Sequence, residues 1–279
     1  MRAILTTALT VCGAWLFAPV AAGLVRQWST DPEYAHALLV VPFALGLAWM
    51  RRDALRACPR APRVSGYFVA LAGLALLAVG TLGAELFLTR VAFVLVVAGG
   101  LVFLAGWRHL RIVALPMTLL ALAIPLPAIV SNQITLPLQI LASTAAEHVV
   151  ALSNIPILRE GNVLILPNAT LQVAEACSGI RSLSALVTMA VIVAWTFERR
   201  QGMRALIVLS AIPIAVLTNA VRVALTAFAA YWWGSSVATG PLHEIGGWIL
   251  FTLSTLLIVE LARRVGAATD LPNPQVAAV

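Results

Sequence analysis

Long apolar runs separated by short arginine-rich segments recur along almost the whole chain, and they leave few folds open to it. A helix needs about 20 mostly apolar residues to cross a bilayer. Lipid offers the backbone no hydrogen-bond partners, so a spanning segment must satisfy its own amides as a helix. Hydrophobic residues make up 61% of the 279 residues and charged residues only 10%, too few to cover a water-soluble surface. We therefore expect an all-α, polytopic integral membrane protein.

Eight segments have the composition of a membrane-spanning helix. They cover residues 4–25, 35–50, 66–83, 88–106, 110–130, 180–197, 205–230 and 245–262. The first is long and ends without a convincing cleavage site, so we expect a retained helix rather than a signal peptide. With no internal repeat visible, we expect one transmembrane domain over residues 1–265 and a short cytoplasmic tail over residues 266–279.

The arginines give the orientation of these spans. All 18 basic residues are arginine, and the net charge is +7. If the N-terminus is cytoplasmic, 13 of the 18 lie inside: Arg2, Arg51, Arg52, Arg56, Arg60, Arg63, Arg108, Arg111, Arg199, Arg200, Arg204, Arg263 and Arg264. Since cytoplasmic loops are enriched in arginine, we expect both termini in the cytoplasm. An all-Arg basic set beside abundant Ala, Val and Leu is typical of a GC-rich bacterial genome, so we expect the bacterial inner membrane. Clusters between apolar runs do not form the solvated basic face that nucleic-acid binding needs.

One outer stretch, residues 131–179, departs from the spanning pattern. Residues 134–150 alternate apolar and polar side chains at helical spacing, which predicts a helix at the membrane interface. Residues 155–174 contain short apolar runs separated by Glu-Gly-Asn and Pro-Asn-Ala, which predicts a small periplasmic β-meander. Ordered loops of this length are usually functional, and this one leads directly to Cys177.

Three residues from different predicted helices fall at the outer, periplasmic face: Cys177, Arg222 and His243. A cysteine thiolate can attack a peptide carbonyl and leave a thioester. The helix that begins beside Ser178 favours the thiolate, whereas Glu175 opposes it. His243 can exchange a proton with the thiol, and Arg222 can stabilise a developing oxyanion.

Each of these residues also has a structural interpretation. Cys177 could be a small packing residue, as we expect for Cys12 within the first span. A charge within a span costs ~2.5–3.5 kcal/mol and usually marks a functional site, but Arg222 could instead form a salt bridge or reach the interface. His243 could be an interfacial hydrogen-bonding group. Arg181 could hold a substrate or lipid headgroup, or merely anchor its helix.

Several segments, in order, resemble the signature segments of the exosortase and archaeosortase family. Three of them carry the residues above: Glu175-Ala-Cys-Ser-Gly-Ile-Arg-Ser182, Asn219-Ala-Val-Arg222, and a His shortly before the last span. The others are Tyr34-Ala-His-Ala-Leu-Leu-Val-Val-Pro42, with Ala37 where the family usually has Gly, Ile124-Pro-Leu-Pro127 and Arg159-Glu-Gly-Asn162. The resemblance extends from about Trp28 to Phe251.

The resemblance implies a membrane-embedded cysteine transpeptidase or protease with Cys177, Arg222 and His243 as its catalytic set. Its substrates would be exported proteins with a tripartite C-terminal tail of the PEP-CTERM type: a recognition motif, a transmembrane helix and a basic cluster. The new C-terminus would pass to a lipid or exopolysaccharide acceptor of the envelope, and we expect no metal or other cofactor. We expect supporting or substrate-binding roles for Arg181, Ser178, Asn219 and His36.

Two other functions remain open at this stage. In a transporter or channel, Arg222 would bind an anion and Cys177 would be incidental, so Cys177→Ala would be tolerated. In a non-catalytic assembly factor for polysaccharide export, substitution of all three residues would leave function intact. Membrane lipids are partners under every reading, and nucleic acid under none.

Overall fold

The computed structural model describes residues 2–173, 179–234, 236 and 240–267, with the backbone alone for residues 2–10, 242 and 267. Helices make up most of the described chain, and one small sheet interrupts them. The chain forms two compact units, residues 1–127 and 128–279, and each has a hydrophobic core of its own.

The regular elements of the first unit are all helices where it is described. Its helices are α1 (Arg2–Thr30), α2 (Ala37–Met50), α3 (Arg52–Ala57), α4 (Val64–Leu82), α5 (Leu86–Ala105), α6 (Trp107–Ile112) and α7 (Ala114–Leu122). Helices α4 and α5 match the predicted spans over residues 66–83 and 88–106 to within a few residues. Helix α2, within the predicted span over residues 35–50, is apolar but short.

Helices α4 and α5 form a tight hairpin that is built on glycine. Gly66, Gly73 and Gly80 are buried in α4, seven residues apart. A Cβ added at Gly73 would lie 2.8 Å from Val96 Cγ2, and one at Gly80 would lie 2.9 Å from the backbone nitrogen of Thr89 in α5. Between helices in lipid, close approach through small residues supplies van der Waals packing where no hydrophobic driving force exists.

The prediction of one continuous span over residues 110–130 is wrong. Helix α6 ends at Ile112, α7 is a separate short helix, and an irregular segment precedes the next helix of the chain. Pro116 explains the first break, because in a continuous helix its ring would collide with the carbonyl of Ile112. Pro125 and Pro127 explain the second, since each disfavours helical backbone at the residue before it.

The second unit combines helices with the small sheet. Its elements are α8 (Ala128–Ala151), β1 (Leu158–Glu160), β2 (Val163–Leu166), β3 (Ala169–Gln172), α10 (Ile180–Phe197), α11 (Gln201–Trp233) and α12 (Pro241–Ala267). Six helices of the described chain are long and apolar enough to cross a membrane, namely α4, α5, α8, α10, α11 and α12. The prediction of an all-α, multi-pass membrane protein with a small sheet is therefore confirmed.

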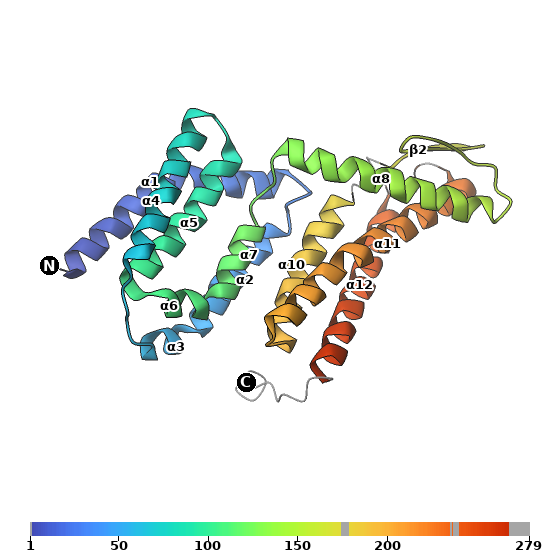
Figure 1. The fold of residues 1–279 in the computed structure, drawn as a ribbon. Coiled ribbons are helices and arrows are strands. Elements are labelled where there is room, and N and C mark those ends of the chain that lie inside the picture. Colours follow the sequence, from blue (N-terminus) through green and yellow to red (C-terminus); the bar gives the residue numbers. More distant parts are fainter. Residues whose placement is uncertain (1, 174–178, 235, 237–239, 268–279) are drawn as a thin grey trace. The chain divides into compact units, whose positions relative to one another are not determined.

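Helix α11 is the centre of the second unit, because it packs against α8, α10 and α12. Small side chains such as Ala190, Ala194, Ala211 and Ala215 are buried where α10 and α11 meet. Figure 1 shows α8 running crosswise to α10 and α12, past the ends at which these two helices begin. Helix α8 thus has the length of a span but lies across its neighbours.

The predicted β-meander is present as a three-stranded antiparallel sheet in the order β1-β2-β3. Leu164 and Leu166 in β2 and Leu171 in β3 are buried, while their neighbours in the strands are more exposed. This alternation places one face of the sheet on α8 and α11, where it shares a core with Ala146 and Ala227. The sheet is therefore a packed part of the unit.

The turn between β1 and β2 is anchored to α8. Arg159 Nε donates to Glu147 Oε2 at 2.8 Å, Ser143 Oγ donates to the carbonyl of Gly161 at 3.1 Å, and Asn162 Nδ2 donates to Gln139 Oε1 at 3.1 Å. Gly161 has a φ of +64°, a conformation that glycine adopts at no steric cost. The segment Arg159-Glu-Gly-Asn162 therefore fastens the sheet to the crosswise helix.

Candidate active site

Arg222 of α11 and His243 of α12 lie in direct contact. The Nη2 atom of Arg222 is 2.7 Å from the Nε2 atom of His243. The ion pairs of the described residues all lie elsewhere, and none of them gives Arg222 a carboxylate partner. Among the described residues, the partner of this guanidinium is thus an imidazole.

Thr226, one turn further along α11, completes a small network. Its Oγ1 atom lies 3.2 Å from His243 Nδ1 and 2.8 Å from the backbone carbonyl oxygen of Arg222. The Thr226 side chain is buried, with 8% of the residue exposed. Both ring nitrogens of His243 therefore have partners on α11, and this contact fixes the ring relative to Arg222.

Gly247 of α12 has no side chain, and this leaves room for the guanidinium of Arg222. A Cβ added at Gly247 would lie 3.1 Å from both Cζ and Nη2 of Arg222. Beside this contact is a cavity of about 20 Å³, whose polar lining includes Asn219, Thr218 and Ser254, and this is space for one water molecule. Thr218 Oγ1 and Ser254 Oγ are themselves hydrogen-bonded at 2.7 Å.

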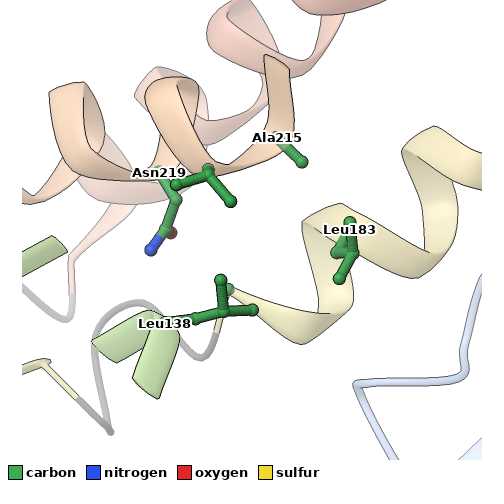
Figure 2. A pocket seen from close by; sticks show the side chains of 6 residues that line it. Leu138, Leu183, Ala215 and Asn219 are labelled. Atoms are coloured by element: carbon green, nitrogen blue, oxygen red, sulfur yellow. The ribbon is translucent and has the colours of Figure 1, made fainter. Parts of the chain in front are cut away.

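Asn219 also lines a second, smaller cavity of about 10 Å³. Figure 2 shows its amide pointing from α11 toward Leu138 of α8 and the beginning of α10. Only 5% of Asn219 is exposed, and its Oδ1 atom and the Nε atom of Arg222 are buried with no hydrogen-bond partner among the described residues. Two unsatisfied polar atoms one helical turn apart are costly, and they are available to bind a polar group.

Gly179 brings the start of α10 against Asn219. Its φ of +66° favours glycine, and an added Cβ would lie 3.3 Å from Asn219 Nδ2. Gly179 precedes the first residue of α10, so the helix begins at the edge of the smaller cavity. No three His, Cys, Asp or Glu side chains in the described parts of the chain are grouped to hold a metal ion.

The other predicted site residues differ in where they lie and in whether the structure describes them. Cys177 and Ser178 lie outside the described residues. Arg181 is exposed at the first turn of α10, and it forms no ion pair with another described residue. His36, half-buried just before α2, belongs to the first unit, whereas Arg222 and His243 belong to the second. The roles expected for these residues stay predictions.

Two of the family-like segments meet inside the first unit. The backbone N–H of Leu126 donates to the Tyr34 hydroxyl at 3.2 Å, and Trp28 Nε1 donates to the carbonyl of Ala123 at 2.9 Å. Tyr34 and Trp28 are both buried. These bonds satisfy backbone groups in the irregular segment before Pro127, so the segments around Tyr34 and Ile124-Pro-Leu-Pro127 support each other structurally.

Sequence reasoning missed Thr226 and Gly247. Thr226 follows Arg222 by four residues, a spacing that places both on one face of a helix, and this was the available signal. Gly247 follows His243 by four residues in the same way. Neither spacing shows that the two faces meet, which requires the packing of α11 on α12.

These features define a class: a polytopic α-helical membrane protein with an arginine–histidine pair held between two packed helices. A family model described as transmembrane exosortase (Exosortase_EpsH) matches residues 28–259. The chain belongs to this family of exosortases. The match covers both compact units and nearly the range, Trp28 to Phe251, over which the sequence resembles the family. Neither the search of curated proteins nor that of solved structures found a match.

Proposed function

We propose that this protein is a membrane-embedded cysteine transpeptidase in which Cys177 is the nucleophile and Arg222 and His243 act on the reacting carbonyl and proton. Membership of the exosortase family supports a transmembrane protein-sorting function in general. The observation that carries the assignment to residues is the 2.7 Å contact between Arg222 and His243. An ionisable pair within membrane-spanning helices is expensive and usually functional.

Protons and bonds balance in a reaction that uses Cys177, Arg222 and His243. The thiol proton of Cys177 passes to His243, and the sulfur attacks the peptide carbonyl carbon while Arg222 stabilises the oxyanion. The C–N bond then breaks, and the leaving amine takes the proton from His243. An acceptor amine or hydroxyl attacks the thioester, its proton returns through His243, and the thiol is released.

The resting geometry suggests how substrate binding starts this sequence. His243 Nε2 is the atom that would take the thiol proton, and it is occupied by Arg222 Nη2. A substrate carbonyl oxygen accepts hydrogen bonds from guanidinium N–H groups as well as imidazole nitrogen does. When the carbonyl replaces the imidazole on Arg222, Nε2 becomes available as a base, so substrate binding and base activation are coupled.

Chain connectivity supports the participation of Cys177. Gly179 packs against Asn219, which lies one helical turn before Arg222. Two peptide units span at most about 7 Å, and Cys177 precedes Gly179 by two residues. We therefore propose that Cys177 acts together with the helix that carries Arg222.

We place the site at the periplasmic side of a bacterial inner membrane, with both termini in the cytoplasm. Arginine asymmetry supports this orientation. Arg52 stacks on Trp49 at 5.3 Å and Arg204 on Trp195 at 4.8 Å, both at helix ends that we assign to the cytoplasmic interface. Eight crossings result if α1 and α2 span, if α6 and α7 cross together as a broken helix, and if α8 lies at the interface.

The proposed substrates are exported proteins with a tripartite C-terminal tail of the PEP-CTERM type, transferred to a lipid or exopolysaccharide acceptor. Cysteine favours transfer, because a thioester reacts readily with amines and a site near lipid headgroups limits competing water. Arg181, exposed at the start of α10, would attract an acceptor that bears an anionic group.

The test uses a tailed protein encoded by the same genome, co-expressed with the enzyme. Processing should be lost with Cys177→Ala and with Arg222→Lys, since lysine lacks the guanidinium fork. Cys58→Ala should process like the wild type and serves as the matched cysteine control. Mass spectrometry of the new C-terminus should show an adduct.

Two results would overturn parts of this proposal. Wild-type processing by Cys177→Ala would exclude the cysteine enzyme and favour a transporter or an assembly factor. A free carboxylate on essentially every processed molecule, in cells with an intact envelope, would show a protease and exclude transfer.

A further inference from the structure

The hydroxyl of Thr226 connects two groups of the Arg222–His243 pair. It lies 2.8 Å from the Arg222 carbonyl oxygen in its own helix and 3.2 Å from His243 Nδ1 in α12. Thr226 is buried, so its hydrogen bonds are shielded from exchange with water. The directions of these bonds can be derived from the chemistry of the partners.

Arg222 decides the protonation of one ring nitrogen. A guanidinium has only donors, so the 2.7 Å contact requires Nη2 to donate and Nε2 of His243 to accept. An Nε2 atom that accepts carries no hydrogen. The neutral ring must then carry its proton on Nδ1.

Thr226 independently determines the protonation of the other ring nitrogen, Nδ1. The backbone carbonyl of Arg222 can only accept, so the single hydroxyl hydrogen of Thr226 is donated to it. The hydroxyl oxygen keeps its lone pairs and can accept from Nδ1–H of His243. Both derivations give the same tautomer, although they start from different neighbours.

We propose that Thr226 is a positioning residue that fixes His243 in the Nδ1–H tautomer and keeps Nε2 free of hydrogen. The opposite tautomer would direct Nε2–H at the guanidinium, with two donors facing each other, and would leave Nδ1 without a donor on Thr226. A base that is oriented by a third group is a general arrangement in nucleophilic catalysis. The catalytic consequence rests on the proposed function, whereas the tautomer does not.

The direct test is ¹⁵N solid-state NMR of ¹⁵N-histidine-labelled protein in lipid bilayers. The chain has only 4 histidines, and His243→Gln identifies the signals of interest. Wild-type His243 should show a protonated Nδ1 and an unprotonated Nε2. Thr226→Val keeps the shape but removes the acceptor of Nδ1–H, which leaves Arg222 as the one contact that selects the tautomer. A second Nε2–H signal should therefore appear beside the Nδ1–H signal, whereas Thr226→Ser should keep the wild-type pattern.

Thr188→Val is the matched control, because buried Thr188 donates the same kind of bond to Ser184 O at 2.8 Å in α10. With a tailed substrate, Thr226→Val should lower kcat roughly tenfold to a hundredfold with KM changed less than about twofold. Thr226→Ser and Thr188→Val should process at close to the wild-type rate. A purely structural role for Thr226 would instead lower the amount of folded protein equally in both valine variants.

An Nε2–H tautomer in the wild-type protein would overturn the proposal. An unchanged histidine spectrum in Thr226→Val would overturn it as well. If the predicted spectra are found in a protein that processes no tailed substrate, the proposed function fails and the role of Thr226 in fixing the tautomer stands.

Discussion

Adjacent glycines in α12 offer a matched pair of substitutions that isolates the guanidinium of Arg222. A Cβ at Gly247 would lie 3.1 Å from Cζ and Nη2 and 3.4 Å from Nε of Arg222, whereas a Cβ at Gly246 would meet no atom within 4 Å. Non-bonded atoms prefer separations of about 3.5–4.0 Å. Gly247→Ala therefore pushes the guanidinium by a few tenths of an ångström, and Gly246→Ala leaves it in place.

The expected loss follows from the bond that the shift disturbs. Hydrogen bonds that involve a charged group contribute about 1.5–3 kcal/mol, so misplacing the Arg222 guanidinium should lower kcat/KM by roughly tenfold to a hundredfold. Alanine is about 1 kcal/mol better than glycine in a helix, and it offers the same gain at Gly246 and Gly247. Folding therefore does not explain a difference between the two variants.

The assay is processing of a tailed substrate by each variant in reconstituted vesicles at equal enzyme amounts. Gly246→Ala should stay within about twofold of the wild type, while Gly247→Ala should not. Equal, wild-type rates for both variants would refute the reasoning, because the guanidinium would then tolerate displacement without any cost to function.

Two further predictions concern the helices and the orientation. Gly66→Ala should destabilise the α4–α5 hairpin by about 1–3 kcal/mol, because its Cβ would lie 2.7 Å from the Cα of Phe103. Gly100→Ala has open space around its Cβ and should not destabilise it. Thermal aggregation in detergent measures the two stabilities, and equal melting temperatures would contradict the prediction. In intact cells, a membrane-impermeant maleimide should label Cys177 in a single-cysteine variant and leave Cys58 unlabelled; the reverse pattern would invert the topology.

The sequence was most informative where one force dominates. The prediction for residues 180–197 agrees with α10 at both ends, since helix formation in an apolar run depends on the backbone and on lipid alone. The β-meander was also predictable, because turn residues separate its short apolar runs. The prediction of one span over residues 110–130 was wrong, because it gave apolar composition more weight than Pro116, Pro125 and Pro127.

The candidate site could be predicted only as a set of residue types. Charge within a span singled out Arg222, and the segment before the last helix singled out His243. Their contact, and the participation of Thr226 and Gly247, depends on how α11 and α12 pack, which periodicity does not specify. The anchoring of the β1–β2 turn through Ser143, Glu147 and Gln139 was unpredictable for the same reason.

The size of the cavity beside Arg222 has a consequence for how the protein responds to its bilayer. A volume of about 20 Å³ admits a water molecule and excludes a peptide backbone. On the proposed function, a substrate carbonyl that reaches Arg222 through this cavity has to part α12 from α10 and α11, and lipid acyl chains around these helices would resist that movement. Turnover should then depend on the elasticity of the bilayer, and rates in vesicles that differ only in acyl-chain length would measure this mechanical component.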